Sequence, residues 1–154
     1  MTDAARSKRN PGAERRPKAP GRNETPAQRS EIMRAVKSRD TKPELIVRKL
    51  LWSIAPGYRL YRADLPGKPD IVYARRRLAI FVHGCFWHGH DCARGARAPR
   101  TNAAYWSAKI ARNRARDETT LQRLAAQGWR TLVIHECELK HIDALRSRLG
   151  AALA

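Results

Sequence analysis

The chain has 154 residues, 42% of them apolar, and its 32 Lys and Arg against 14 Asp and Glu give a formal net charge of +18. This length supports one domain. No apolar run approaches the roughly 18–20 residues of a membrane span and no signal-peptide pattern opens the chain, so we expect a soluble, cytoplasmic protein. So large a positive charge favours a polyanionic partner, most often nucleic acid, over a merely solvated basic surface or an anionic membrane.

The first 24 residues differ in composition from the rest. They are rich in Arg, Lys, Pro and Gly and hold few large apolar side chains, so we predict a disordered basic arm over residues 1–24 and one folded domain over residues 25–154. Residues 1–30 carry eight Lys and Arg against three Asp and Glu, which leaves a net charge of +13 on the remainder. The folded part itself is therefore basic.

Two helices are predicted at the start of the domain. Thr25 followed by Pro26 is a typical helix start, and a short helix follows it. A second helix should begin where Thr41 and Glu44 form a capping box, and it should end before the Pro-Gly pair at 56–57. Its apolar face is expected to consist of Leu45, Leu50, Leu51 and Ile54.

Three short strands and a helical crossover should follow. Residues 58–63, 70–73 and 78–82 read as strands whose short connections favour an antiparallel meander. A long helix capped by Thr101 or Asn102 should run to about Ala126, and a fourth strand over residues 129–134 should lie parallel to its neighbour. A last helix covers residues 142–153. This order predicts an α/β domain with a single mixed sheet flanked by helices, with Trp52 and Trp129 in its core.

Residues 81–92 concentrate possible metal ligands directly after the third strand. They hold three of the five histidines and two of the three cysteines. Cys85, His90, Cys92 and the later Cys137 would make a closed Cys₃His zinc site of the structural type. His88 competes with His90 as the fourth ligand, and spacing does not choose between them. The alternative is a set of buried thiols and unrelated histidines. Cys137 weighs against it, because a fourth strand beside the third would bring this thiol to the cluster.

Asp70 begins a strand whose neighbour ends at His83. A carboxylate beside a ligand-bearing strand end suits a Mg²⁺-dependent phosphodiesterase, although Pro-Asp is also an ordinary turn end. His83 and His88 are candidates for taking a proton from the attacking water, or else packed histidines. Glu44 could bind a metal-bound water or serve only as a helix cap.

Large aromatic residues stand among these candidate ligands. Phe86 and Trp87 are adjacent, so at least one should be exposed, where it could stack on bases. On the long helix, Trp106 shares a stripe with Asn113 and lies near Lys109, a mixture that a sealed core would not contain. We expect the start of this helix to face the ligand. The alternative is that Trp106 packs in the core.

Five motifs occur in an order that resembles a known family, the very short patch repair (Vsr) DNA mismatch endonucleases. They are Ser38-Arg-Asp-Thr41 with Glu44, Leu65-Pro-Gly-Lys-Pro-Asp70, His83-Gly-Cys-Phe-Trp-His88, Arg100-Thr-Asn with Tyr105-Trp106, and Glu136-Cys137. The resemblance runs from about Arg29 to Lys140. It implies a restriction-endonuclease-like (PD-(D/E)XK-type) fold and an enzyme that nicks one strand 5′ to the thymine of a T:G mismatch left by deamination of 5-methylcytosine.

The resemblance also implies roles for individual residues. Asp70 and the backbone carbonyl of Val82 would bind Mg²⁺, with Glu44 supporting a metal-bound water. His88 would be the general base, and His83 would contact the phosphate or the water. The implied structural zinc ligands are Cys85, His90, Cys92 and Cys137. The implied DNA contacts are a wedge made by Phe86, Trp87 and Trp106 and base-edge contacts from Lys109, Asn113 and Lys140.

Three positions depart from the family pattern. Val82 stands where Thr is frequent, His135 where an aromatic residue is common, and Lys140 where a base-reading Arg is expected. The implied partner is double-stranded DNA with a T:G mismatch, acted on by a monomer alongside mismatch-repair proteins. Two other functions stay open: a zinc-stapled DNA-binding module without catalysis, and a restriction enzyme of the same fold that cuts both strands of a matched site.

Overall fold

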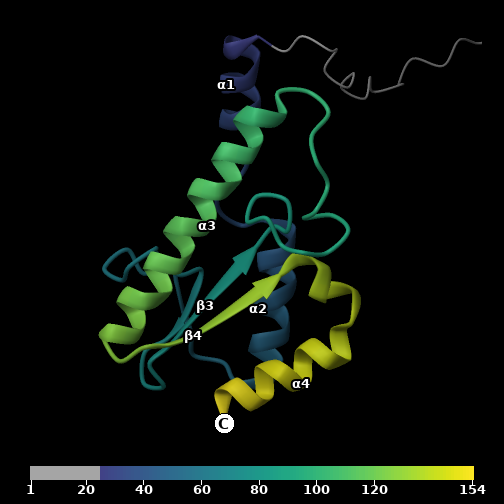
Figure 1. Ribbon diagram of the computed structural model, residues 1–154. Helices are drawn as coiled ribbons and strands as arrows, with labels where there is room; N and C mark the ends of the chain where they lie inside the picture. Colours follow the sequence, from purple (N-terminus) through teal and green to yellow (C-terminus); the bar gives the residue numbers. More distant parts are fainter. Residues whose placement is uncertain (1–24) are drawn as a thin grey trace, which may run out of the picture.

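A four-stranded mixed sheet forms the centre of the computed structural model, which describes residues 25–154 (Figure 1). The strands stand in sequence order, β1 (Arg59–Leu60), β2 (Ile71–Tyr73), β3 (Leu78–His83) and β4 (Arg130–His135). The first three pair antiparallel, and β4 pairs parallel with β3. The predicted meander and crossover are confirmed. The predicted arm over residues 1–24 lies outside the described residues.

Four α-helices and one 3₁₀ helix complete the domain. They are α1 (Pro26–Ala35), α2 (Lys42–Ile54), α3 (Ala103–Ala126), the 3₁₀ helix η1 (Glu136–Lys140) and α4 (Ile142–Leu153). The predicted order of helices and strands is confirmed, with η1 as an unpredicted addition. In Figure 1, α3 runs obliquely across one side of the sheet, while α2 and α4 lie on the other side. None of the helices described between residues 25 and 154 has the length and apolar character that crossing a membrane requires.

Alternate residues of the strands bury into two separate cores, as expected for a sheet covered on both faces. Ile71 and Ile80 face α2 and α4, whereas Val72 and Phe81 face α3. The larger core lies between the sheet, α2 and α4. The helices contribute to it Val47, Leu50, Leu51, Leu145, Leu149 and Leu153. The smaller core joins the sheet to Leu124, near the end of α3. The end of β3 is thus held rigidly from both faces.

The predicted starts of α1 and α2 are both confirmed, but the capping box predicted for Thr41 and Glu44 is not formed. Thr25 and Gln28 form a capping box at the start of α1. Thr41 caps no amide of α2. Its hydroxyl donates to Glu44 Oε1 at 2.7 Å instead, and Glu44 Oε2 accepts from the amide of Asp40 at 3.1 Å. The Thr41 hydroxyl thus acts as a donor to the carboxylate and not as an acceptor for a helix amide.

Three expectations about burial and strand length were wrong. Trp52 is 64% exposed and Leu45 is 50% exposed, because the buried face of α2 is centred on Val47 and Leu51. The first strand has two residues rather than six, since Tyr61 adopts a left-handed conformation with φ +49°. Trp129, in contrast, packs against the smaller core as expected.

Candidate functional site

The parallel pairing of β3 and β4 builds the site, because their carboxyl ends meet at one edge of the sheet. His83, the last residue of β3, is opposite His135, the last residue of β4. The loop that follows β3 therefore lies beside η1, which follows β4. This brings Cys137 to a loop that precedes it by about fifty residues.

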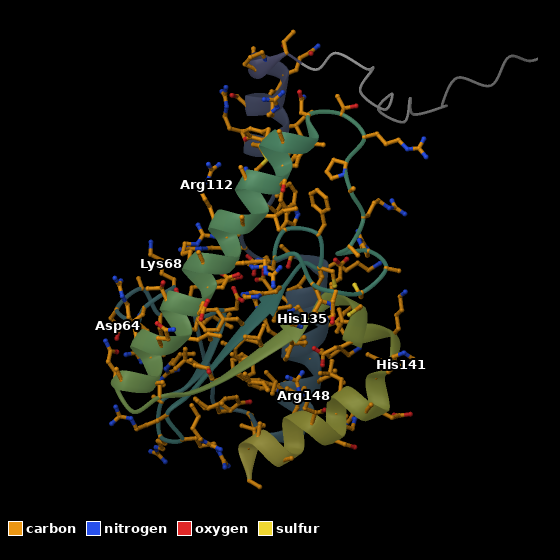
Figure 2. All side chains as sticks on the ribbon, viewed as in Figure 1. Asp64, Lys68, Arg112, His135, His141 and Arg148 are labelled. Atoms are coloured by element: carbon orange, nitrogen blue, oxygen red, sulfur yellow. The ribbon has the colours of Figure 1, made fainter. Side chains whose placement is uncertain are left out.

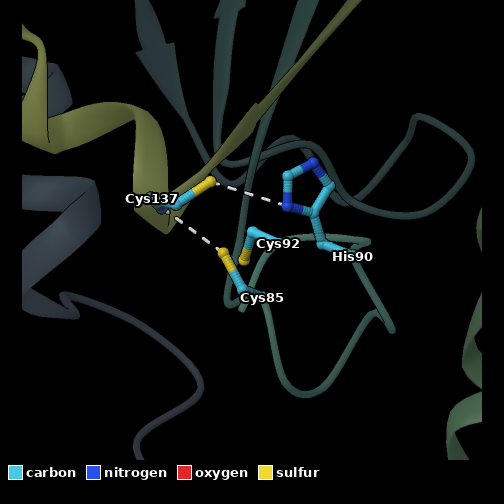
Figure 3. A group of neighbouring side chains, drawn as sticks. All are labelled: Cys85, His90, Cys92 and Cys137. Atoms are coloured by element: carbon cyan, nitrogen blue, oxygen red, sulfur yellow. Dashed lines mark hydrogen bonds between the residues drawn. The ribbon is translucent and has the colours of Figure 1, made fainter. Parts of the chain in front are cut away.

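Four possible metal ligands meet at this edge. One ligand atom from each of Cys85, His90, Cys92 and Cys137 lies within 4.8 Å of all the others (Figure 3). The Sγ of Cys137 is 3.5 Å from the Nδ1 of His90. Zinc bonds of about 2.3 Å to sulfur and about 2.0 Å to nitrogen put tetrahedral ligands roughly 3.5–3.8 Å apart. The donor atoms and their spacing therefore fit a zinc ion.

The three thiols have different surroundings: burial raises the pKa of Cys85 to about 12 and also raises that of Cys137, whereas the surroundings of Cys92 favour its thiolate. The amide of Cys137 donates to the Sγ of Cys85 at 3.3 Å, and the amide of Gly95 donates to the Sγ of Cys92 at 3.4 Å. A hydrogen bond with His90 lowers the pKa of Cys92 to about 6. Backbone N–H groups aimed at sulfur are a common second layer around bound metal. His135, the departure from the family's aromatic residue, supplies a flat ring that stacks on His90 with centroids 3.9 Å apart.

Two glycines permit the tight loop that carries these ligands. Gly89 has φ +58°, and a Cβ there would lie 2.7 Å from Ile110 of α3. A Cβ on Gly95 would lie 2.0 Å from the carbonyl oxygen of His90. The loop therefore closes on itself and against α3 only with glycine at both positions. Within this loop, His90 lies with the three cysteines, whereas His88 contacts Asp117.

His88 belongs to a second cluster, with His83 and Asp117. Its Nδ1 lies 2.5 Å from Asp117 Oδ2, and its ring stacks on that of His83 with centroids 3.6 Å apart and planes within 7°. Burial, and then the charge of His88, lower the pKa of His83 to about 3 and keep this ring neutral. The sequence analysis gave Asp117 no role, although it lies four residues after Asn113 on the same stripe of α3. An acidic residue within that stripe was the available signal.

This second cluster suits proton transfer better than metal binding. Its three possible ligand atoms lie within 4.8 Å of one another, as in a metal site. However, a ring nitrogen binds metal in the plane of its ring at about 2.0 Å. Two nearly parallel rings stacked 3.6 Å apart cannot both aim a nitrogen at one ion. A carboxylate on Nδ1 instead orients the His88 ring and leaves Nε2 as the acceptor.

Asp70 lines the same cleft as these histidines. Its Oδ2 accepts a hydrogen bond from the amide of Val82 at 2.8 Å, which ties the start of β2 to the end of β3. Burial raises the pKa of Asp70 to about 6, and the charge of Glu44 adds to the rise. The cleft has a volume of about 1310 Å³ and is also lined by Glu44, Val82, His83, His88 and Asp117. Oxygen ligands, two carboxylates and a carbonyl, suit Mg²⁺.

An aromatic cluster stands at one side of this cleft. The rings of Phe86, Trp87 and Trp106 contact one another edge to face, with centroids 5.2–6.0 Å apart. All three are half-buried. Lys109 Nζ lies 5.8 Å from the centroid of the Trp87 ring. The side-chain Nδ2 of Asn113 donates to the backbone carbonyl of Trp87 at 2.9 Å. Asn113 thus holds Trp87 in place, a contact that the sequence did not indicate.

Basic side chains surround the cleft, whereas Lys140 stands apart from it. Figure 2 shows side chains projecting along α3 and from the neighbouring turn, where Arg112 and Lys68 are labelled. The cations that line the cleft are Lys37, Lys42, Lys68, Arg94, Lys109 and Arg116. Lys140 is exposed at the end of η1, outside the residues that line the cleft.

Several known proteins are similar to this chain in sequence. Residues 23–94 match the family model described as DNA mismatch endonuclease Vsr. The Type II nicking enzyme V.XorIIP of Xanthomonas oryzae pv. oryzae is 52% identical over 125 residues, which cover 81% of this chain and 91% of the relative. The DNA mismatch endonuclease Vsr of Escherichia coli is 42% identical over 119 residues, covering 77% and 76%. The nicking enzyme V.NmeAIP of Neisseria meningitidis is 41% identical over 129 residues, covering 82% and 89%.

The mixed α/β domain, its acidic and histidine-lined cleft and these relatives define the chain as an endonuclease. Within that class it belongs to the Vsr family of DNA mismatch endonucleases. The family resemblance stated from the motifs is confirmed.

Proposed function

We propose that the chain is a Mg²⁺-dependent endonuclease that nicks one DNA strand 5′ to the thymine of a T:G mismatch arising from deamination of 5-methylcytosine. The observation that carries the proposal is one cleft in which Asp70 and Glu44 lie with the His88–Asp117 pair, beside an aromatic cluster. The names of the relatives, a mismatch endonuclease and nicking enzymes, support the substrate and the single-strand cut. The sheet, with Asp70 directly before β2, also suits the restriction-endonuclease-like fold that we assign to it.

The residues divide the work of phosphodiester hydrolysis. Asp70 and the Val82 carbonyl would hold Mg²⁺, which supplies charge for the scissile phosphate and activates water when bound. His88 accepts the proton of the attacking water at Nε2, while Asp117 keeps its ring oriented. His83, neutral because of burial, hydrogen-bonds the phosphate or the water.

Zinc at Cys85, His90, Cys92 and Cys137 would position both the base and the wedge. Phe86, Trp87 and His88 all lie between the first two of these ligands, so one ion would tie their loop to η1. Unstacking a base pair costs a few kcal/mol and costs least at a mismatch, so an aromatic wedge favours T:G sites. Lys109, Asn113 and Lys140 are the proposed DNA contacts of a protein that acts as a monomer.

The deciding experiment is strand-resolved cleavage of a duplex with one T:G pair, labelled on either strand, with matched T:A and C:G duplexes as controls. We expect one nick on the thymine strand that requires Mg²⁺ and disappears with chelator. Cutting of both strands at a matched site would assign a restriction-type enzyme. Binding without any cut would leave a DNA-binding module and refute the enzymatic proposal.

Replacing Asp117 by Asn should lower the nicking rate about 100-fold, a loss within the range of general-base catalysis. The amide keeps the shape but can present its N–H to Nδ1, which disfavours the productive tautomer of His88. Single-turnover nicking at saturating enzyme measures the effect. Glu118→Gln, an exposed neighbour on α3, is the matched control. Equal rates for the two variants would remove Asp117 from the mechanism.

Replacing Trp87 by Ala should reduce the preference for T:G over matched duplex about tenfold, since stacking on one base is worth about 1–3 kcal/mol. Fluorescence anisotropy with both duplexes measures the preference. Trp52→Ala is the control, because Trp52 is a largely exposed tryptophan on α2. If Trp87→Ala weakened binding to the T:G duplex and to the matched duplex equally, a wedge at the mismatch would be contradicted.

A further inference from the structure

Glu44 is the one charged side chain in the buried class between residues 25 and 154, with 3% of its surface exposed. It lies in the first turn of α2 and lines the same cleft as Asp70. A buried carboxylate persists only if its oxygen atoms are satisfied. The groups that satisfy Glu44 therefore also determine where it presents a free lone pair.

The two oxygens of Glu44 are occupied unequally. Oε2 accepts from the Asp40 amide at 3.1 Å, from Arg48 Nη2 at 3.1 Å and from the Tyr61 hydroxyl at 2.8 Å. Oε1 contacts only the Thr41 hydroxyl, at 2.7 Å, among the described residues. A carboxylate offers about four acceptor positions. Oε1 therefore keeps capacity to accept one more donor.

Arg48 and Tyr61 bind the carboxylate of Glu44 without lining the cleft themselves. Thr41 lines the cleft together with Glu44, whereas neither Arg48 nor Tyr61 is among its lining residues. Oε2 is thus held by Arg48 and Tyr61, and Oε1 is left beside Thr41, a residue of the cleft wall. A water molecule on a metal ion is the kind of donor that this oxygen could accept.

Arg48 is itself strongly constrained. Its side chain is 12% exposed, and Nη1 binds Asp40 Oδ1 at 2.7 Å while Nη2 binds Glu44. Nη2 also contacts the Tyr61 hydroxyl. Its Nε is buried and has no hydrogen-bond partner within the part of the chain that the structure describes. A buried donor without a partner is costly. The position of the guanidinium is therefore set by its ion pairs with Asp40 and Glu44, and Nε is left without a hydrogen bond to any described residue.

Two residues that bind Glu44 or Arg48 also have strained backbone conformations. Asp40 and Tyr61 both lie in the left-handed region, with φ of +53° and +49°. This conformation is rare for a residue as bulky as tyrosine, and such strain concentrates at functional sites. Both strained residues contact the pair: the amide of Asp40 donates to Glu44, and the hydroxyl of Tyr61 contacts Glu44 and Arg48.

We infer that Arg48 and Tyr61 are positioning residues, which orient Glu44 so that its Oε1 accepts a hydrogen bond from a water on the divalent cation. The inference rests on the proposed function for its cation and deepens it. Neither residue touches the substrate, and both act through Glu44. Partners of this second layer typically change metal affinity or activity about 10–100-fold when they are removed.

The test compares Arg48→Met and Tyr61→Phe with wild type as full-length, zinc-loaded protein. Nicking of a T:G duplex is followed against Mg²⁺ concentration, and Mn²⁺ binding without DNA is followed by electron paramagnetic resonance. We expect the half-saturating Mg²⁺ concentration to rise about tenfold in both variants, with a matching loss of Mn²⁺ affinity. Glu44→Gln should shift both readings in the same direction.

Two controls separate positioning from general destabilisation. Arg62→Met removes an arginine paired with the exposed Asp64, and Tyr73→Phe removes a buried hydroxyl that donates to the carbonyl of Ala55. Both controls should keep the Mg²⁺ and Mn²⁺ dependence of wild type even where the melting temperature falls. Should Arg48→Met not fold, Tyr61→Phe, which loses one oxygen atom, decides the question.

Unchanged Mg²⁺ and Mn²⁺ dependence in Tyr61→Phe would overturn the inference, as would an equal shift in the controls. Failure of wild type to nick the T:G duplex would instead refute the proposed function. The Mn²⁺ titration would still decide whether Arg48 and Tyr61 orient Glu44 toward a cation.

Discussion

Replacing Asp70 by Ala should lower the nicking rate at least about 1000-fold, equivalent to about 4 kcal/mol of transition-state stabilisation. The proposed Mg²⁺ site has two direct protein ligands, the carboxylate of Asp70 and the backbone carbonyl of Val82. Of these two, only the carboxylate can carry a charge. Its Oδ2 also holds the amide of Val82, so the change disturbs the second proposed ligand as well. Single-turnover nicking of a T:G duplex measures the loss.

Binding to the same duplex separates lost chemistry from lost recognition. We expect Asp70→Ala to bind T:G DNA at least as tightly as wild type, since a negative charge has left a basic cleft. Asp64→Ala removes an exposed carboxylate from the preceding turn and should leave the rate unchanged. A rate within tenfold of wild type for Asp70→Ala would exclude Asp70 as the metal ligand.

Replacing His90 by Ala should release the zinc ion and lower the free energy of unfolding by at least about 4 kcal/mol, as expected when a metal site is lost. Structural zinc contributes about 10–16 kcal/mol of apparent binding free energy in small domains, so losing one of four ligands removes a large share. Elemental analysis of the purified protein should fall from about one zinc per chain to none. Thermal unfolding with and without a chelator measures the stability.

Two other histidines provide the comparison. His88→Ala should keep its zinc and most of its stability but lose nicking, because His88 pairs with Asp117 rather than with the thiols. His141→Ala, at an exposed position before α4, should keep zinc, stability and activity. Zinc loss in His88→Ala together with zinc retention in His90→Ala would reverse the assignment of the two residues.

The loop from Cys85 to His90 serves three purposes at once. Two of its residues belong to the Cys-His cluster, two belong to the aromatic cluster and one pairs with Asp117. Because five of six consecutive residues have such contacts, damage to the metal site should reach both catalysis and mismatch preference. Zinc removal is therefore expected to resemble the combined loss of Trp87 and His88.

Local pattern predicted most of the secondary structure. The extent of α4 and the helix start at Thr25 and Pro26 depend on neighbours in sequence, and both predictions matched the structure. Trp52 did not, because an apolar residue on a helix is buried only if its face meets another element, and that depends on the position of the whole helix. The cap predicted at Thr41 did not match either, because its hydroxyl donates to the buried carboxylate of Glu44 and accepts from no helix amide.

The sequence by itself determined the kind of chemistry available: thiols and histidines after a strand, a carboxylate at the start of its neighbour, and aromatics between the ligands. Spacing alone did not separate His88 from His90, and the family resemblance assigned them to different sites. Only the tertiary structure found Asp117 as the partner of His88 and placed Arg48 and Tyr61 against Glu44. Such pairings, including that of His90 with Cys137, join residues up to 47 positions apart. Their distances depend on how β4 and α3 pack against β3, which spacing along one segment does not encode.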